Sequence, residues 1–144
     1  MDFSDLINKG QLKKEQTSKA DITSFLQFAE EEISAAKFNL EKFPLTAYKS
    51  AYDALIHAGN ALVRFHGLRT TTKYTHVTIT EFVERVMGKE CIDLVSFFKR
   101  MRRKRHPLQY EARFLETKEE IRKSITRAEA LVKKIEEFMD IKLG

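Results

Sequence analysis

The residues best suited to chemistry in this chain form one basic run, residues 99–105, with the sequence KRMRRKR. Six of these seven residues are cationic, and the whole chain has a formal net charge of +5, so the other residues together are close to neutral. Guanidinium and ammonium groups bind phosphate oxygens through charge-assisted hydrogen bonds. The cluster therefore indicates a phosphate-binding surface, although a solvated helix face is the simpler explanation for part of it.

The direction of each cation follows from the helical period of about 100° per residue. Upstream of the run, one face of the helix is apolar and should be buried. This face consists of Cys91, Leu94, Val95, Phe98 and Met101. One further turn brings the face to Arg102 and, near its centre, to Arg105, whereas Arg100 points to the opposite side. The other three cations lie off the face, and we expect them to be solvated.

Arg105 is the cation whose direction bears on the function of the protein, because its side chain points along the apolar face. A guanidinium on the apolar side of a helix must find an acidic, backbone or phosphate partner, or reach a subunit boundary, because an unpaired charge there is costly. Two simpler explanations stand beside a phosphate site: the side chain snorkels from the helix end, or it forms a structural ion pair with a glutamate. The sequence leaves these alternatives open.

The composition favours long helices as the elements that position the run. The chain has 144 residues, of which 42% are hydrophobic and 33% charged, as expected for one soluble domain with a core. Five glycines and two prolines are few for a turn-rich β fold. Cys91 is the single cysteine, which excludes an intramolecular disulfide and a cysteine-based zinc site. No apolar run is long enough for a membrane span and the N-terminus is no signal peptide, so we predict a cytoplasmic protein without metal or cofactor.

Apolar residues recur at helical spacing along most of the chain. We predict helices over residues 21–40, 45–66 and 75–87, a fourth that carries the basic run and ends at Pro107, and a fifth that opens with a capping box of Thr117 and Glu120. Ser18 or Asp21 should cap the first helix, and Gly67 should close the second. Residues 1–20 are predicted to form an arm or short helix, and residues 68–74 a loop. The predicted fold is all-α, an antiparallel up-and-down four-helix bundle with one additional short helix, forming a single domain over residues 21–140.

A polar stripe on the second predicted helix offers a second candidate for chemistry. Asp53, His57, Asn60 and Arg64 follow one another at i, i+3 or i, i+4 spacing. Asp53 and His57 could form an acid–base pair, but a solvated face with a mild i, i+4 contact explains them more simply. The four histidines of the chain lack the spacing of metal ligands.

Two segments carry a resemblance to a known family. The segments AYKSAYDAL (residues 47–55) and ALVRFHGLR (residues 61–69) resemble the signature helix of HEPN domains. The segment MRRKRHPLQY (residues 101–110) is similar to the second motif of that family, in which an arginine at a helix end is commonly followed by asparagine. The resemblance covers roughly residues 20–140. It implies a four-helix bundle with an added helix, usually homodimeric and associated with RNA or nucleotides.

The resemblance also implies a register for the site. In the catalytically active branch, an arginine followed after four to six residues by histidine forms a metal-independent ribonuclease site at the dimer interface. If Arg105 is the motif arginine, as its inward direction argues, Tyr110 holds the histidine position and His106 the asparagine position. A phenol with a pKa near 10 is a poor general base at neutral pH. The rival register pairs Arg100 with His106, although Arg100 points away from the apolar face and Pro107 disturbs the geometry of His106.

Three functions follow as hypotheses. The first is a homodimeric module that binds RNA or a nucleotide at a cleft between subunits, through Arg102, Arg103, Arg105 and Tyr110. The second is a metal-independent ribonuclease, the toxin of a toxin–antitoxin or defence system, that uses Arg100 or Arg105 with His106. The third is a non-catalytic helical partner of a nucleotidyltransferase or an antitoxin.

Overall fold

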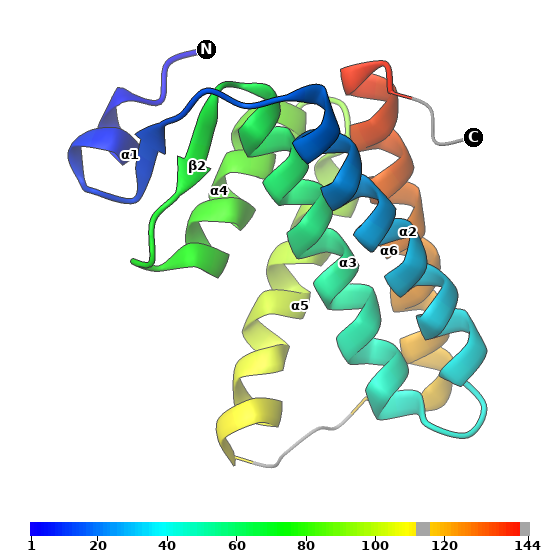
Figure 1. Ribbon diagram of the computed structural model, residues 1–144. Helices are drawn as coiled ribbons and strands as arrows, with labels where there is room; N and C mark the ends of the chain where they lie inside the picture. The colour runs from blue at the N-terminus through cyan, green and yellow to red at the C-terminus, as the bar shows by residue number, and fades with distance from the viewer. Residues whose placement is uncertain (112–115, 142–144) are drawn as a thin grey trace.

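The computed structural model describes residues 1–111 and 116–141, with side chains for residues 1–105 and 116–141. Six helices and one two-stranded sheet follow one another in this part of the chain (Figure 1). They are α1 (Ser4–Asn8), β1 (Leu12–Lys14), α2 (Lys19–Asn39), α3 (Pro44–Phe65), β2 (Leu68–Thr70), α4 (Thr75–Met87), α5 (Ile92–Glu111) and α6 (Lys118–Met139). The predicted all-α class is confirmed. Within the described residues, no helix combines the length and the apolar character needed to cross a membrane.

Helix α3 is the central element of the fold. It contacts α2, α4, α5 and α6, and Figure 1 shows α2 and α6 on one side of it and α4 and α5 on the other. Small residues allow this close packing: a Cβ at Gly59 would overlap the side chain of Ile79 from α4. Between the small residues, Tyr48 and Tyr52 are large and fully buried. The two tyrosines stand one turn apart on α3, and each faces cations of α5.

The predicted helix ends are largely confirmed. Ser18 caps α2, and its side chain accepts a hydrogen bond from the Asp21 backbone N–H at 3.1 Å. Pro44 begins α3, where its missing N–H costs no hydrogen bond. Gly67 follows α3 with a φ of 71°, the left-handed conformation that glycine adopts without strain. Thr117 and Glu120 form the predicted capping box of α6.

The prediction of a loop over residues 68–74 was wrong for its first three residues. Leu68–Thr70 pairs antiparallel with Leu12–Lys14, and Leu12 lies opposite Thr70. Two strands of three residues show no recognisable alternation, so only the packing of the N-terminal residues reveals them. Phe3 stacks on Phe82 of α4 with ring centroids 4.3 Å apart, and this contact helps to hold the N-terminal segment against the core.

The prediction that Pro107 ends the helix with the basic run was also wrong, because α5 continues to Glu111. A proline inside a helix removes one backbone hydrogen bond and crowds the preceding turn, but it need not end the helix. Phe98 and Met101 are fully buried, and they anchor α5 nine and six residues before the proline. Figure 1 shows the end of α5 extending well past the first turn of α4. This part of α5 carries the basic run.

Candidate functional site

The basic run of α5 sends its cations to two different sides of the helix. Met101 is buried, and Arg105, one turn later, follows the same direction toward α3. The Arg105 side chain is 26% exposed, compared with 54% for Arg100, which faces α6. The directions predicted for Arg105 and Arg100 therefore agree with the structure. The expectation that Lys104 is solvated was wrong, because its ammonium group contacts the largely buried carboxylate of Glu116. Each direction leads to a separate group of polar residues.

The first group, which we call the Arg105 cluster, consists of Tyr52 and Asp53 from α3, His76 from α4, and Arg102 and Arg105 from α5. The guanidinium carbon of Arg105 lies 5.3 Å from the centroid of the Tyr52 ring, a cation–π contact. One guanidinium nitrogen, Nη2, lies 3.9 Å from Asp53 Oδ1. This distance is too long for a direct hydrogen bond, so Asp53 orients the guanidinium by charge. The face of Tyr52 and the carboxylate of Asp53 thus hold Arg105 from two directions.

Tyr52 also connects Arg105 to a histidine. The Tyr52 hydroxyl lies 2.9 Å from Nδ1 of His76. Burial raises the pKa of Tyr52, against the opposing charges of Arg105 and Arg102, so the phenol stays protonated at neutral pH. We infer that the phenol O–H donates a hydrogen bond to Nδ1, so that the proton of the neutral imidazole is on Nε2. His76 then presents Nε2–H as a hydrogen-bond donor.

The charge state of His76 is set by its surroundings. Burial lowers the pKa of His76, and the positive charge of Arg105 lowers it further, while Asp53 opposes these effects. The imidazole is therefore neutral at pH 7. His76 was absent from the sequence-based candidates, although one signal was available: it precedes Ile79 and Val83 by three and seven residues, on the buried face of α4.

The structure separates the other sequence-based candidates. Arg102 is half-buried beside the Arg105 cluster, and its charge acts on Tyr52 and His76. Arg103 is exposed. The side chains of His106 and Tyr110 lie outside the described residues, so both remain candidates from the sequence alone.

The predicted contact between Asp53 and His57 is replaced by contacts with other helices. His57 pairs with Glu32 of α2 through Nδ1, and this hydrogen bond raises the pKa of His57. Asp53 lies beside Arg105 instead. The polar stripe of α3 therefore divides between two neighbours, because each residue meets the helix packed on its own side.

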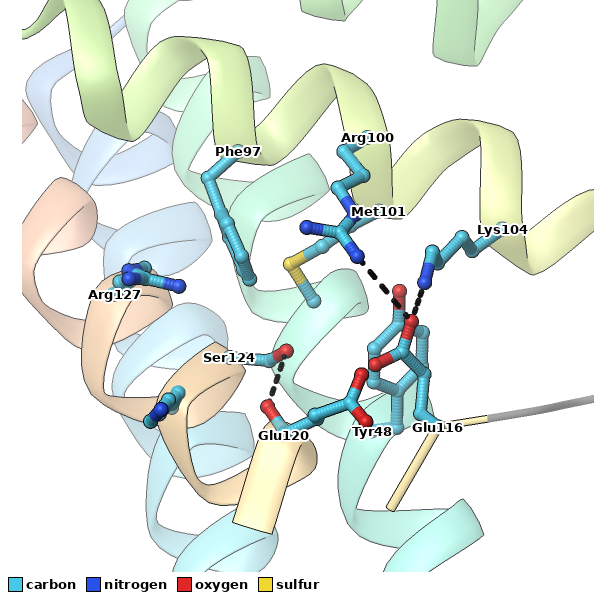
Figure 2. Close-up of a pocket in the computed structure, with 10 residues that line it drawn as sticks. Tyr48, Phe97, Arg100, Met101, Lys104, Glu116, Glu120, Ser124 and Arg127 are labelled. Atoms are coloured by element: carbon cyan, nitrogen blue, oxygen red, sulfur yellow. Dashed lines mark hydrogen bonds and ion pairs between the residues drawn. The ribbon is translucent and has the colours of Figure 1, made fainter. Parts of the chain in front are cut away.

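The second group of cations lines a pocket between α5 and α6, which we call the α5–α6 pocket (Figure 2). Its volume is about 200 Å³. The lining residues are Tyr48, Phe97, Arg100, Met101, Lys104, Glu116, Glu120, Lys123, Ser124 and Arg127. The Glu116 side chain is 6% exposed, contacts Lys104, and lies 4.0 Å from Arg100. The same helix that presents Arg105 to α3 thus presents two further cations to α6.

The Arg105 cluster has the chemistry of an anion site. Among the described side chains of this cluster, two guanidinium groups accompany one carboxylate, and the neutral His76 adds an N–H donor rather than a third charge. Arginine binds phosphate oxygens through two parallel N–H donors, a geometry that lysine lacks. The arrangement suits a phosphodiester, which carries a single negative charge.

The comparison with known families covers most of the chain. A family model described as HEPN domain matches residues 22–138. The match extends from the first turns of α2 to the last turn of α6 and contains every described residue of the Arg105 cluster and the α5–α6 pocket. No curated protein matches the sequence significantly.

Proposed function

Because the chain belongs to the HEPN domain family, we propose that it binds single-stranded RNA and that the Arg105 cluster holds one backbone phosphate. The family is associated with RNA and nucleotides, and the Arg105 cluster gives this association a physical location in the chain. Arg105 and Arg102 supply the charge. The Nε2–H group of His76 supplies a further hydrogen bond.

The observation that carries this proposal is the fixed orientation of Arg105. A long, flexible side chain loses conformational freedom when it binds a ligand, and this loss weakens binding. Tyr52 and Asp53 hold the guanidinium before any ligand arrives, at 5.3 Å and 3.9 Å respectively. Tyr52 is itself fully buried and hydrogen-bonded to His76, so the ring that contacts Arg105 is held in a fixed position.

We also propose that two copies of the chain associate beside this cluster. Tyr74, the residue before α4, and Val77, in the first turn of α4, are large hydrophobic residues close to His76 in the sequence, with 62% and 42% exposure. Figure 1 shows that α5 extends beyond the start of α4. A second subunit there would cover these side chains and bring a second basic helix end close to the first.

The test of RNA binding is fluorescence anisotropy with a labelled single-stranded RNA. Arg105→Ala should weaken binding about tenfold or more, the effect expected for loss of an oriented phosphate contact, and should reduce the dependence on salt. Arg103→Ala is the matched control, because it removes the same charge from an exposed position on the same helix. Equal losses in the two variants would show that only net charge matters and would contradict the proposal.

Association is tested separately by light scattering at micromolar concentration. We expect a dimer for the native chain. Val77→Glu places a charge on the exposed apolar surface and should yield a monomer with an unchanged helical spectrum. A native chain that is monomeric at this concentration would contradict the proposed dimer. It would not affect the proposed RNA site, which the anisotropy experiment tests separately.

A second candidate function, cleavage of RNA, is favoured by the position of His76 beside Arg105. For cleavage, the imidazole would take the other tautomer, with Nδ1–H directed to the Tyr52 hydroxyl oxygen. Its Nε2 would accept the proton of the ribose 2′-OH as the 2′-oxygen attacks phosphorus, and the imidazolium would return that proton to the departing 5′-oxygen while the guanidinium binds the phosphate. Cleavage of RNA by the purified chain in the presence of a chelator, lost in His76→Gln and retained in His106→Ala, would assign this role. Cleavage that His106→Ala abolishes would instead favour the register that includes His106.

A further inference from the structure

The α5–α6 pocket lies on the opposite side of α5 from the RNA site proposed above and has no part in it. Figure 2 shows Phe97, Arg100, Met101 and Lys104 descending from α5 toward Glu120, Ser124 and Arg127 of α6. Tyr48 of α3 lies behind them and is almost completely buried. Three helices therefore build the walls of the pocket.

The charges of the pocket do not balance. In the part of the chain that the structure describes, four cations and two carboxylates line it, an excess of two positive charges: the cations are Arg100, Lys104, Lys123 and Arg127, and the carboxylates are those of Glu116 and Glu120. Glu120 is committed to the capping box, where its Oε1 lies 3.1 Å from the Thr117 hydroxyl. Among the described residues, no ion pair joins Lys123 or Arg127 to a carboxylate. An anion in the pocket would meet this excess charge.

Glu116 shows that the pocket accommodates an oxyanion. Its carboxylate is 6% exposed and lies between the ammonium group of Lys104 and the guanidinium group of Arg100. Burial lowers the pKa of Lys104, and repulsion by the neighbouring charge of Arg100 lowers it further, while Glu120 raises it. A second anion beside Glu116 would relieve this repulsion.

The size and walls of the pocket limit its ligand. A volume of about 200 Å³ is smaller than the roughly 300–1,000 Å³ of a typical drug-binding site, so a chain of nucleotides does not fit inside. A phosphate group with a substituent the size of one sugar fits inside the pocket. Phe97 and Met101 provide an apolar wall, and Arg127 lies over the Phe97 ring with its guanidinium carbon 4.7 Å from the centroid.

We propose that the α5–α6 pocket binds the phosphate monoester of a small organic molecule. A monoester carries nearly two negative charges at neutral pH, which match the two excess positive charges of the lining, whereas a phosphodiester carries one. Lys123 and Arg127 bind the phosphate oxygens, and the apolar wall contacts the organic part. The pocket thus recognises the terminal phosphate of a small molecule, whereas the Arg105 cluster recognises a phosphodiester within an RNA strand.

The test is isothermal titration calorimetry with ribose 5-phosphate, adenosine 5′-monophosphate and inorganic phosphate as separate probes. Lys123→Ala should weaken binding of the two organic phosphates about tenfold, the equivalent of one charge-assisted contact. Lys134→Ala is the matched control, since it removes the same charge from α6 at a position that does not line the pocket. If inorganic phosphate bound as tightly as the two organic phosphates, the phosphate group alone would be recognised. If adenosine 5′-monophosphate bound more tightly than ribose 5-phosphate, the apolar wall would contribute to binding.

A second variant should change affinity in the opposite direction. Glu116→Gln removes the carboxylate that competes for Lys104 and Arg100, so all three probes should bind more tightly, by about tenfold. Absence of binding at millimolar concentration in both the native chain and Glu116→Gln would overturn the proposal, as would equal weakening by Lys123→Ala and Lys134→Ala. Arg105→Ala should leave the titration unchanged, so this result and the RNA test fail or succeed separately.

Discussion

The two sides of α5 carry the same kinds of residue, namely cations, a tyrosine and a carboxylate, but differ in how the carboxylate contacts the cations. Each side places two cations of the basic run near a buried tyrosine of α3. The charges of Arg102 and Arg105 act on Tyr52, and Arg100 and Lys104 line the same pocket as Tyr48. The carboxylates differ. Asp53 is partly exposed and lies 3.9 Å from Arg105, whereas Glu116 is almost fully buried and contacts Lys104 directly. A carboxylate at 3.9 Å orients a cation without a direct hydrogen bond, while a direct, buried contact neutralises part of the charge of the cation.

This difference explains why one basic run supports two sites. Arg100 and Arg105 are five residues apart and so about 140° apart around the helix, which directs them to different neighbours. The side with α3 and α4 contributes a histidine and the side with α6 contributes further cations. The type of anion that each side favours therefore depends on the neighbouring helix rather than on the run.

The largest effect should come from the residue that holds both sites in place. Phe98 is fully buried on α5 and its ring centroid lies 6.2 Å from that of Tyr52. Phe98→Ala should reduce the free energy of unfolding by about 3–5 kcal/mol and weaken binding on both sides of α5. Urea unfolding measures the loss. Ile92→Ala, at an exposed position of the same helix, should change stability by less than about 0.5 kcal/mol.

A pair of conservative variants separates the two sides. Tyr52→Phe removes the hydrogen bond to His76 and should weaken RNA binding by about fivefold, as expected for about 1 kcal/mol. Tyr48→Phe removes a hydroxyl from the α5–α6 pocket and should weaken ribose 5-phosphate binding by a similar factor. Each variant is the control for the other. If both variants weakened both ligands equally, the two sides would form one coupled unit.

Glu136, a half-buried acid away from both sites, shows the effect of placing one carboxyl group beside another. Burial and the neighbouring Glu30 raise the pKa of Glu136 to about 8. The folded protein therefore keeps this carboxyl protonated while the unfolded chain ionises it, so its cost to stability grows from about pH 4.5 to pH 8. Glu136→Gln should raise the free energy of unfolding by roughly 1 kcal/mol at pH 9, after allowance for solvent screening, and by nothing at pH 4. Thermal unfolding at the two pH values measures this difference.

The smallest effect should be a pH dependence of RNA affinity, caused by His76 of the Arg105 cluster. The pKa of His76 lies below its usual value of 6.5, so the imidazole gains a proton only under acidic conditions. That proton adds a charge beside Arg105 and should strengthen RNA binding by a few-fold as the pH falls through this pKa. The same proton destabilises the fold, because the unfolded chain accepts it more readily. His76→Gln should remove the change in affinity between pH 7 and pH 5, measured by anisotropy.

Much of the local structure could be predicted from the sequence. The caps at Ser18 and Thr117 and the glycine at position 67 involve residues close together in the chain, and the structure confirms each. The opposite directions of Arg105 and Arg100 follow from the helical period alone. The continuation of α5 past Pro107 could not be foreseen, since the local preference of a proline was outweighed within a helix anchored by Phe98 and Met101.

The sequence by itself determined which side of its own helix each residue occupies, because helical periodicity is a property of neighbouring residues. Only the tertiary structure decided what each residue meets there. It brought His76 to Tyr52 across 24 positions, paired His57 with Glu32 rather than Asp53, and placed Glu116 against Lys104. These contacts join residues on separate elements, and their partners depend on how whole helices pack against α3, which no local pattern specifies.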